Sequence, residues 1–171
     1  FTITFDRSFD DVIHGCRTVR KEGTGTWITK DMYDAYRELH RLGYTHSVEV
    51  WDGNDLVGGL YGVGIGSFFA GESMFSRVRD ASKFAFAALI GYFDLLGAPM
   101  IDCQSYTGYL ASFGAIEIPR ERFLAEIGPL QARERCGPEW STVDGGEMLR
   151  RGLARHLSNN AQRELSDRAQ R

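Results

Sequence analysis

Two carboxylates stand inside apolar segments that are typical of β-strands. Glu72 lies in one of these segments, and Asp102 lies two residues before Gln104 in the other. Because side chains alternate along a strand, Glu72 is expected to share a face with Met74, and Asp102 to share one with Gln104. An unpaired charge is costly to bury, so such carboxylates usually hold a structural partner or take part in binding and proton transfer. The two segments are therefore the best candidates for a functional site.

Each acidic candidate also has a structural interpretation. Glu72 could form an ion pair with Arg77 or Arg79, and Asp102 could cap a helix or a turn from its place at a strand end. Cys103 is expected on the strand face opposite Asp102, which favours a buried thiol over a nucleophile. Both interpretations stay open at the level of single residues.

The elements that must position these residues follow from hydrophobic periodicity. An apolar helix from Ala81 to Gly97 separates the two segments, with Asp80 as its expected N-cap. Strand patterns cover residues 1–5, 47–51, 56–66, 67–75, 99–104 and 115–118. Helix patterns cover residues 9–19 after an N-cap at Ser8, 30–42, 107–113, a segment starting at Pro119, and 148–157.

This order of elements predicts an α+β fold. The sheet is expected to be GNAT-like, mixed and mostly antiparallel, with helices flanking it. A length of 171 residues suits one domain. Residues 1–127 are expected to form this domain, and residues 128–171 a partly helical extension whose polar end, from Asn159, is expected to be disordered.

Composition excludes several functional classes. A net charge of −3 gives no general basic excess of the kind that grips a nucleic-acid backbone. No apolar run approaches the roughly 20 residues of a membrane-spanning helix, so no membrane partner is expected. Three cysteines at unrelated spacings indicate reduced thiols and a cytoplasmic protein, and neither they nor His40 and His46 have metal-ligand spacing. The strand-like start at Phe1 suggests either a sequence cut from a longer protein or one that has lost an upstream part.

Two kinds of phosphate site are disfavoured. The glycines between Gly53 and Gly71 are not followed by the Lys and Ser or Thr of a P-loop. A GNAT acetyltransferase would hold the pyrophosphate of acetyl-CoA on a glycine-rich turn at a helix N-terminus. The corresponding residues 77–83 contain no glycine. The sequence therefore predicts that acetyl-CoA is not a cofactor.

Eight motifs between Asp11 and Phe123 resemble the bacterial leucyl/phenylalanyl-tRNA–protein transferases. They are GTWIT at 25–29, LG at 42–43, HSVEVW at 46–51, LVGGLYGV at 56–63, GESMFS at 71–76, ASK at 81–83, IDCQ at 101–104 and GAIEIPR at 114–120. The resemblance implies a GNAT-like domain that uses aminoacyl-tRNA in place of acetyl-CoA. Family members usually have an N-terminal subdomain, which supplies much of the basic tRNA surface. The resemblance does not extend to this subdomain.

The resemblance also implies an activity. Leucine, phenylalanine or methionine would pass from the 3′ end of aminoacyl-tRNA to the α-amino group of a protein or peptide that begins with Arg or Lys, marking it for degradation by the N-end rule. The reaction is aminolysis of an ester through a tetrahedral intermediate, so reactants must be oriented and an oxyanion stabilised. Neither a metal nor another cofactor is implied, and a cytoplasmic monomer is expected.

Residue roles come from the same resemblance. Asp102 and Gln104 would serve the chemistry, with the Asp102 carboxylate polarising the Gln104 amide, and Glu72 would stand beside the ester. Because Gln is a weak base, a substrate-assisted step or catalysis mainly by positioning stays open beside this role. The 3′-adenosine would contact Trp27, Glu72 and Phe93. The aminoacyl side-chain pocket would consist of Leu60, Phe69, Met74, Phe86, Leu89, Phe93 and Ile101. On helical spacing alone, the apolar members would be interpreted as core residues.

The sequence departs from the family in a few places. Leu89 stands where an aromatic residue is expected, and Tyr109 and Phe113 stand where His and Leu are common. Two alternatives therefore stay open beside the main hypothesis. One is a diverged transferase that uses aminoacyl-tRNA to modify a small molecule or another peptide, and the other is a non-catalytic domain that binds an aminoacyl group or a peptide.

Overall fold

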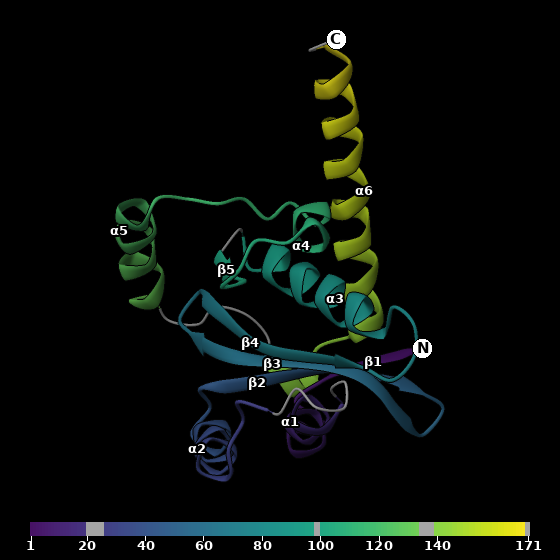
Figure 1. The fold of residues 1–171 in the computed structure, drawn as a ribbon, viewed down its shortest axis with the longest axis vertical. Coiled ribbons are helices and arrows are strands. Elements are labelled where there is room, and N and C mark those ends of the chain that lie inside the picture. Colours follow the sequence, from purple (N-terminus) through teal and green to yellow (C-terminus); the bar gives the residue numbers. More distant parts are fainter. Residues whose placement is uncertain (20–25, 98–99, 134–138, 170–171) are drawn as a thin grey trace.

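The computed structural model describes residues 1–19, 26–97, 100–133 and 139–169. Five strands form one sheet in the order β1-β2-β3-β4-β5 (Figure 1). Their bounds are β1 Thr2–Phe5, β2 Thr45–Asp52, β3 Asp55–Ile65, β4 Phe68–Ser76 and β5 Met100–Asp102. All neighbours are antiparallel except β4 and β5, which are parallel. The predicted α+β class with a mostly antiparallel mixed sheet is confirmed.

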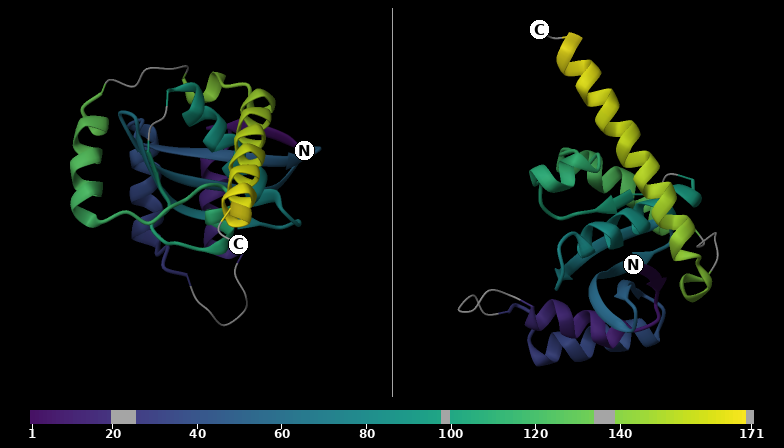
Figure 2. Two further views of the ribbon diagram at one scale, coloured as in Figure 1. Left: turned by 90° about the horizontal axis from the view of Figure 1, so that it is seen from above. Right: turned by 90° about the vertical axis from the view of Figure 1, so that its right-hand side faces the viewer.

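Helices cover both faces of this sheet. On one face lie α1 (Phe9–Thr18) and α2 (Lys30–Arg41), and on the other lie α3 (Ala81–Leu95) and α6 (Gly145–Ala169) (Figures 1 and 2). Each face has its own apolar core: Phe9, Ile13 and Tyr61 belong to the α1 side, and Leu60 and Phe69 to the α3 side. Two shorter helices, α4 (Gly108–Ser112) and α5 (Arg120–Gln131), and the 3₁₀ turn η1 (Trp140–Thr142) follow β5. Among the described helices, none combines the length and apolarity needed to cross a membrane.

The C-terminal extension packs into the α3-side core. Trp140 is 3% exposed and lies against Phe5, Phe69 and Phe93. Helix α6 crosses α3 at very short range, because a Cβ on Gly152 would lie 1.7 Å from the Ala87 carbonyl oxygen. The helix continues to Ala169, past the expected 148–157, and Figure 2 shows it projecting beyond the rest of the fold.

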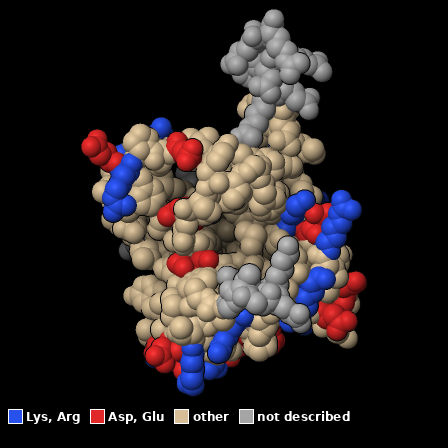
Figure 3. Space-filling model, viewed as in Figure 1, with Lys and Arg blue, Asp and Glu red and all other residues tan. Residues whose placement is uncertain are grey.

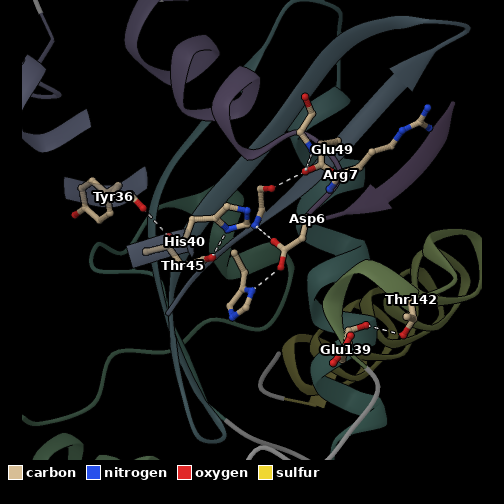
Figure 4. A network of polar contacts seen from close by, with 11 residues as sticks. Asp6, Arg7, Tyr36, His40, Thr45, Glu49, Glu139 and Thr142 are labelled. Carbon is tan, nitrogen blue, oxygen red and sulfur yellow. Dashed lines mark hydrogen bonds and ion pairs between the residues drawn. The ribbon is translucent and has the colours of Figure 1, made fainter. Parts of the chain in front are cut away.

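A buried polar network fixes α2 and the chain before α1 to the sheet (Figure 4). Thr45 Oγ1 donates to the Tyr36 carbonyl oxygen at 2.9 Å, and His40 Nδ1 donates to the Thr45 carbonyl oxygen at 2.7 Å. Asp6 accepts a 2.6 Å hydrogen bond from His46 Nδ1. Glu49 is wholly buried on β2 and accepts from two hydroxyl groups. The Thr45 contacts set the position of α2, which carries Tyr36, and the Asp6 and Glu49 contacts fix β1 and the chain before α1.

One local prediction, a strand at residues 115–118, was wrong, and the two predicted N-caps were confirmed in position only. Residues 115–118 form no strand, because nothing in the described chain pairs with them beyond β5, and Ile116 is 68% exposed. Asp80 and Ser8 occupy the N-cap positions but make no side-chain cap hydrogen bond. In α3 the cap is supplied by Ser76, whose Oγ accepts from the Ser82 amide at 2.9 Å.

Two further differences are smaller. Pro119 precedes the first residue of α5 and does not occupy it. The predicted strand start at residue 99 and the third cysteine, Cys136, lie outside the described residues.

Candidate active site

The site forms where β4 and β5 part. The two strands pair over only three residues each, ending with Ala70 opposite Asp102. Beyond this point Gln104 has a left-handed backbone with φ +60°. Its side-chain Nε2 donates to the Gly71 carbonyl oxygen at 2.8 Å, so it bridges the gap between the strands. The parting strands and this bridge define one edge of the site.

The predicted geometry of Asp102 and Gln104 is only partly found. Gln104 lies beyond β5, so the two residues do not share a strand face as expected. Asp102 Oδ1 accepts a 2.7 Å hydrogen bond from the Gln104 backbone amide, which makes an Asx-type turn. The carboxylate therefore contacts the Gln104 main chain and not its side-chain amide. The chain leaves the strand here because this turn competes with continued pairing.

An apolar cavity of about 190 Å³ opens between the parted strands and α3. Figure 3 shows this hollow near the centre of the face, with acidic side chains close to it. Glu72 and Asp102 both line it, together with six of the predicted pocket residues: Leu60, Phe69, Met74, Phe86, Leu89 and Ile101. The cavity is smaller than the roughly 300–1,000 Å³ clefts that bury drug-sized ligands. Its size suits one apolar side chain.

A β-bulge at Glu72 changes the direction in which its side chain points. Ser73 pairs with Tyr61 and Gly71 pairs with Gly62, so Glu72 is the extra, unpaired residue of β4. The Tyr36 hydroxyl of α2 lies near this carboxylate. Burial and this carboxylate raise the pKa of Tyr36, which keeps the phenol protonated.

The bulge breaks the predicted alternation between Glu72 and Met74. Met74 pairs with Leu60, a residue of the α3-side core, whereas Glu72 reaches Tyr36 on the other side of the sheet. The ion pair suggested for Glu72 is not formed with Arg77, whose guanidinium donates to the Leu56 carbonyl oxygen. Arg79, the other suggested partner, lies 3.5 Å from Asp80.

The three residues predicted for the adenosine do not come together. Trp27 is 38% exposed and meets Tyr36 edge-on, with ring centroids 6.4 Å apart. Trp27 therefore packs on the same tyrosine, Tyr36, that lies near Glu72. Phe93 lies on the α3 side, 5% exposed and packed on Phe69 with ring centroids 5.7 Å apart. Because the sheet separates them, Trp27 and Phe93 cannot stack on one adenine in this conformation.

Phe93 does not line the apolar cavity either. The helical spacing placed it correctly on the inner side of α3, but one turn too far along for this cavity. The sequence reasoning also missed Leu110 and Ser105, which do line it, and the role of Tyr36. The sequence did give one indication of a role for Tyr36. It lies on the inner face of its helix, and the hydroxyl of a buried or half-buried tyrosine usually has a polar partner.

Cys103 lines the cavity as a protonated thiol. Burial, and secondarily the neighbouring Asp102 carboxylate, raise its pKa to about 11. Because the thiolate is the nucleophilic form, this side chain is a poor nucleophile near neutral pH, in keeping with the sequence-based expectation. Across the described residues, no group of three or more His, Cys, Asp or Glu side chains is placed to hold a metal ion.

The N-terminus of α3 is where a GNAT acetyltransferase would bind the pyrophosphate of acetyl-CoA. Asp80 stands at this helix end with its carboxylate 2.7 Å from Lys83 Nζ, and Ser76 caps the Ser82 amide. A carboxylate and an occupied amide make this terminus a poor receptor for a pyrophosphate. That acetyl-CoA is not used remains a prediction.

The site thus lies in a mixed α+β domain whose sheet parts at a parallel strand pair, with carboxylates beside an apolar cavity. The family model of the leucyl/phenylalanyl-tRNA protein transferases matches residues 1–128. The chain belongs to this family.

Three relatives show how much of the family's length is present. The leucyl/phenylalanyl-tRNA–protein transferase of Teredinibacter turnerae is 56% identical over 124 residues, which is 72% of this chain and 48% of the relative. The same enzyme of Saccharophagus degradans is 56% identical over 156 residues, 87% and 64% of the two chains. That of Syntrophus aciditrophicus is 52% identical over 143 residues, 83% and 60%. The chain thus spans about half to two thirds of the length of these relatives.

Proposed function

We propose that this domain transfers leucine, phenylalanine or methionine from aminoacyl-tRNA to the α-amino group of a protein or peptide that begins with Arg or Lys. The observation that carries the proposal is that Glu72, Asp102 and apolar side chains from β3, β4, α3 and β5 line one and the same cavity. The relatives are named as leucyl/phenylalanyl-tRNA–protein transferases, which supports the donor part of the proposal.

The cavity supports a division of roles. Its apolar walls would hold the aminoacyl side chain, and flexible Met74 would let it accept both Leu and Phe. Glu72, held by Tyr36, would orient the ester and the ribose end of the donor, with Trp27 stacking on the terminal adenine. Asp102 and Gln104 would face the incoming amine across the parted strands.

The reaction needs little from the protein beyond positioning and charge. The amine attacks the ester carbonyl, the new C–N bond forms, and the tRNA ribose oxygen leaves with a proton. Gln104 is no base by itself, and its amide hydrogen already points to Gly71. Asp102 keeps one carboxylate oxygen beyond the turn contact, so it is the stronger candidate for accepting the proton or for orienting the amine.

The test is transfer of labelled leucine from charged tRNA to a peptide with N-terminal Arg. The same peptide with an acetylated N-terminus is the substrate control. We expect Glu72→Ala and Asp102→Ala to abolish transfer, and Glu117→Ala, an exposed carboxylate outside the cavity, to leave it unchanged. Full activity in the first two variants would refute the assigned site. Donor binding without any product would favour a non-catalytic domain.

The remaining expectations about the whole protein rest on the same proposal. Its donor is the 3′ end of aminoacyl-tRNA, it acts as a monomer in the cytoplasm, and it requires no metal or other cofactor. Transfer that survives exhaustive chelation and proceeds without acetyl-CoA would support the last point.

A further inference from the structure

A second cavity lies directly behind the first. Its volume is about 220 Å³, and it is bordered by α3, β5, α4, α6 and the chain after α4. Four side chains line both cavities: Phe86, Ile101, Cys103 and Leu110. Cys103 directly follows Asp102, so the two cavities meet one residue from the candidate carboxylate. A ligand in the second cavity would therefore lie beside the proposed reaction centre.

The walls of this cavity combine apolar surface with one carboxylate. Phe93 and Phe113 contribute aromatic rings, and Asp94 on α3 brings its acidic group to the lining. Methylene stems of long basic side chains pack well on such apolar walls while their charged ends meet a carboxylate. A guanidinium is also attracted to aromatic faces. The chemistry of the lining thus suits the side chain of Arg or Lys.

A basic side chain of the same protein already occupies the carboxylate. Arg155 of α6 forms an ion pair through Nη1 with Asp94 Oδ1 and also lines the cavity. The two side chains are 53% and 33% exposed. Ion pairs this accessible to water contribute little to stability, so a competing cation can displace Arg155 at small cost.

We propose that this second cavity binds the basic first side chain of the acceptor, and that Arg155 is its intramolecular stand-in. The inference rests on the proposed function, since it gives the acceptor's side chain a place next to the aminoacyl pocket. An amino group and a side chain leave the same Cα, so one residue can direct its amine toward Asp102 and its cation toward Asp94. Displacement of Arg155 would then select acceptors that begin with a cation.

The experiment compares two peptides in calorimetric titrations without tRNA. One begins with Arg and the other with citrulline, which has nearly the same shape but no charge. Arg155→Gln is expected to tighten binding of the Arg peptide about two- to fivefold and to leave the citrulline peptide unchanged. Asp94→Asn is expected to remove the preference for Arg. The matched control is Arg151→Gln, which breaks the neighbouring α6 pair with Glu147 (3.0 Å), outside the cavity.

Each outcome decides the matter. A preference for Arg that survives Asp94→Asn, or an Arg155→Gln variant that binds the Arg peptide no better than the parent chain, would overturn the inference. If the parent binds neither peptide, Arg155→Gln must reveal binding of the Arg peptide for the inference to stand. Failure of the proposed function would show separately, as absence of transfer from charged tRNA despite charge-dependent peptide binding. Unfolding curves of all three variants confirm that each is folded.

Discussion

Gln104 donates a 2.8 Å hydrogen bond from Nε2 to the Gly71 carbonyl oxygen, across the point where β5 and β4 separate. The bond is made from a left-handed backbone conformation that costs a non-glycine residue roughly 1–2 kcal/mol. The surrounding structure maintains this strain through the Asp102 turn and the bridge itself. Gln104 therefore ties the chain after β5 to Gly71, which lines the apolar cavity.

Substitution of Gln104 should separate its backbone cost from its side-chain role. Gln104→Gly removes both the strain and the bridge, whereas Gln104→Ala removes the bridge alone. The glycine variant is expected to be about 1 kcal/mol more stable than the alanine variant in urea unfolding. Both should lose most aminoacyl transfer. An alanine variant with the parent's transfer rate would show that the bridge is dispensable.

Two substitutions of Asp102 should separate the effect of its negative charge from the effect of the turn that it forms. In Asp102→Asn the side-chain oxygen can still accept from the Gln104 amide, so unfolding should change by less than about 0.5 kcal/mol. Loss of the negative charge is expected to slow transfer about 100-fold or more if the carboxylate accepts a proton. Asp102→Ala loses the turn as well and should also be less stable by about 1 kcal/mol. Normal transfer by the asparagine variant would limit Asp102 to a structural role.

Tyr36 is expected to act through Glu72. Tyr36→Phe removes the hydroxyl that lies near the Glu72 carboxylate. A hydrogen bond between these two groups would contribute about 0.5–1.5 kcal/mol. The expected result is a several-fold higher KM for charged tRNA with kcat little changed, measured by initial rates. Tyr33→Phe on the same helix is the matched control, because Tyr33 lies against Arg17 and Arg37 and not against Glu72. Equal effects in the two variants would argue against positioning of Glu72.

Local pattern predicted most elements because each was encoded within a few residues. The antiparallel strands and the apolar helix over Ala81–Leu95 follow from periodicity and turn residues such as Gly43, which has φ +79°. Residues 115–118 have the composition of a strand, but a strand also needs a neighbour to pair with. The prediction that Gln104 shares a strand face with Asp102 was wrong for a related reason, since the Asp102 turn ends the pairing of β5 with β4.

The site was predictable in its residue types but not in its arrangement. Six apolar wall residues were identified, yet the bulge that turns Glu72 toward Tyr36 depends on pairing between strands. Placing Phe93 away from the cavity depends on how α3 is rotated over the sheet. The ion pair between Arg155 and Asp94 joins residues 61 positions apart, and no local sequence pattern predicts it.

Glu49 should make stability depend on pH. Burial raises its pKa above the value of an exposed glutamate, although hydrogen bonds from Ser47, Thr4 and two backbone amides oppose the shift. A raised pKa in the folded state means that the folded chain binds more protons than the unfolded one. Its stabilising effect is therefore complete below about pH 4.3 and is lost as pH rises through the folded-state value.

Glu49→Gln isolates this contribution because glutamine does not titrate. The unfolding free energy of the parent chain minus that of the variant is expected to fall as pH rises above about 4, as measured by urea unfolding at fixed ionic strength. A difference that is flat or rises with pH would mean that the carboxylate is not held in a desolvating site.

The crossing of α6 over α3 gives the last prediction. A Cβ on Gly152 would lie 1.7 Å from the Ala87 carbonyl oxygen, and one on Gly91 would lie 1.9 Å from that of Met148. Because both obstacles are backbone atoms, Gly152→Ala must push the helices apart, at a cost of about 1–3 kcal/mol in urea unfolding. Gly108→Ala is the matched control, since no heavy atom lies within 4 Å of its Cβ, and it should be neutral or stabilising by up to about 1 kcal/mol.

The same substitution should also reach the site. Helix α3 carries Phe86 and Leu89 into the aminoacyl cavity, so displacing it would alter the cavity's width and reduce transfer in Gly152→Ala but not in Gly108→Ala. A Gly152→Ala variant as stable and as active as the parent would mean that α6 does not rest on α3 in solution. In that event Arg155, which reaches Asp94 only from this crossing, would lose its place at the second cavity.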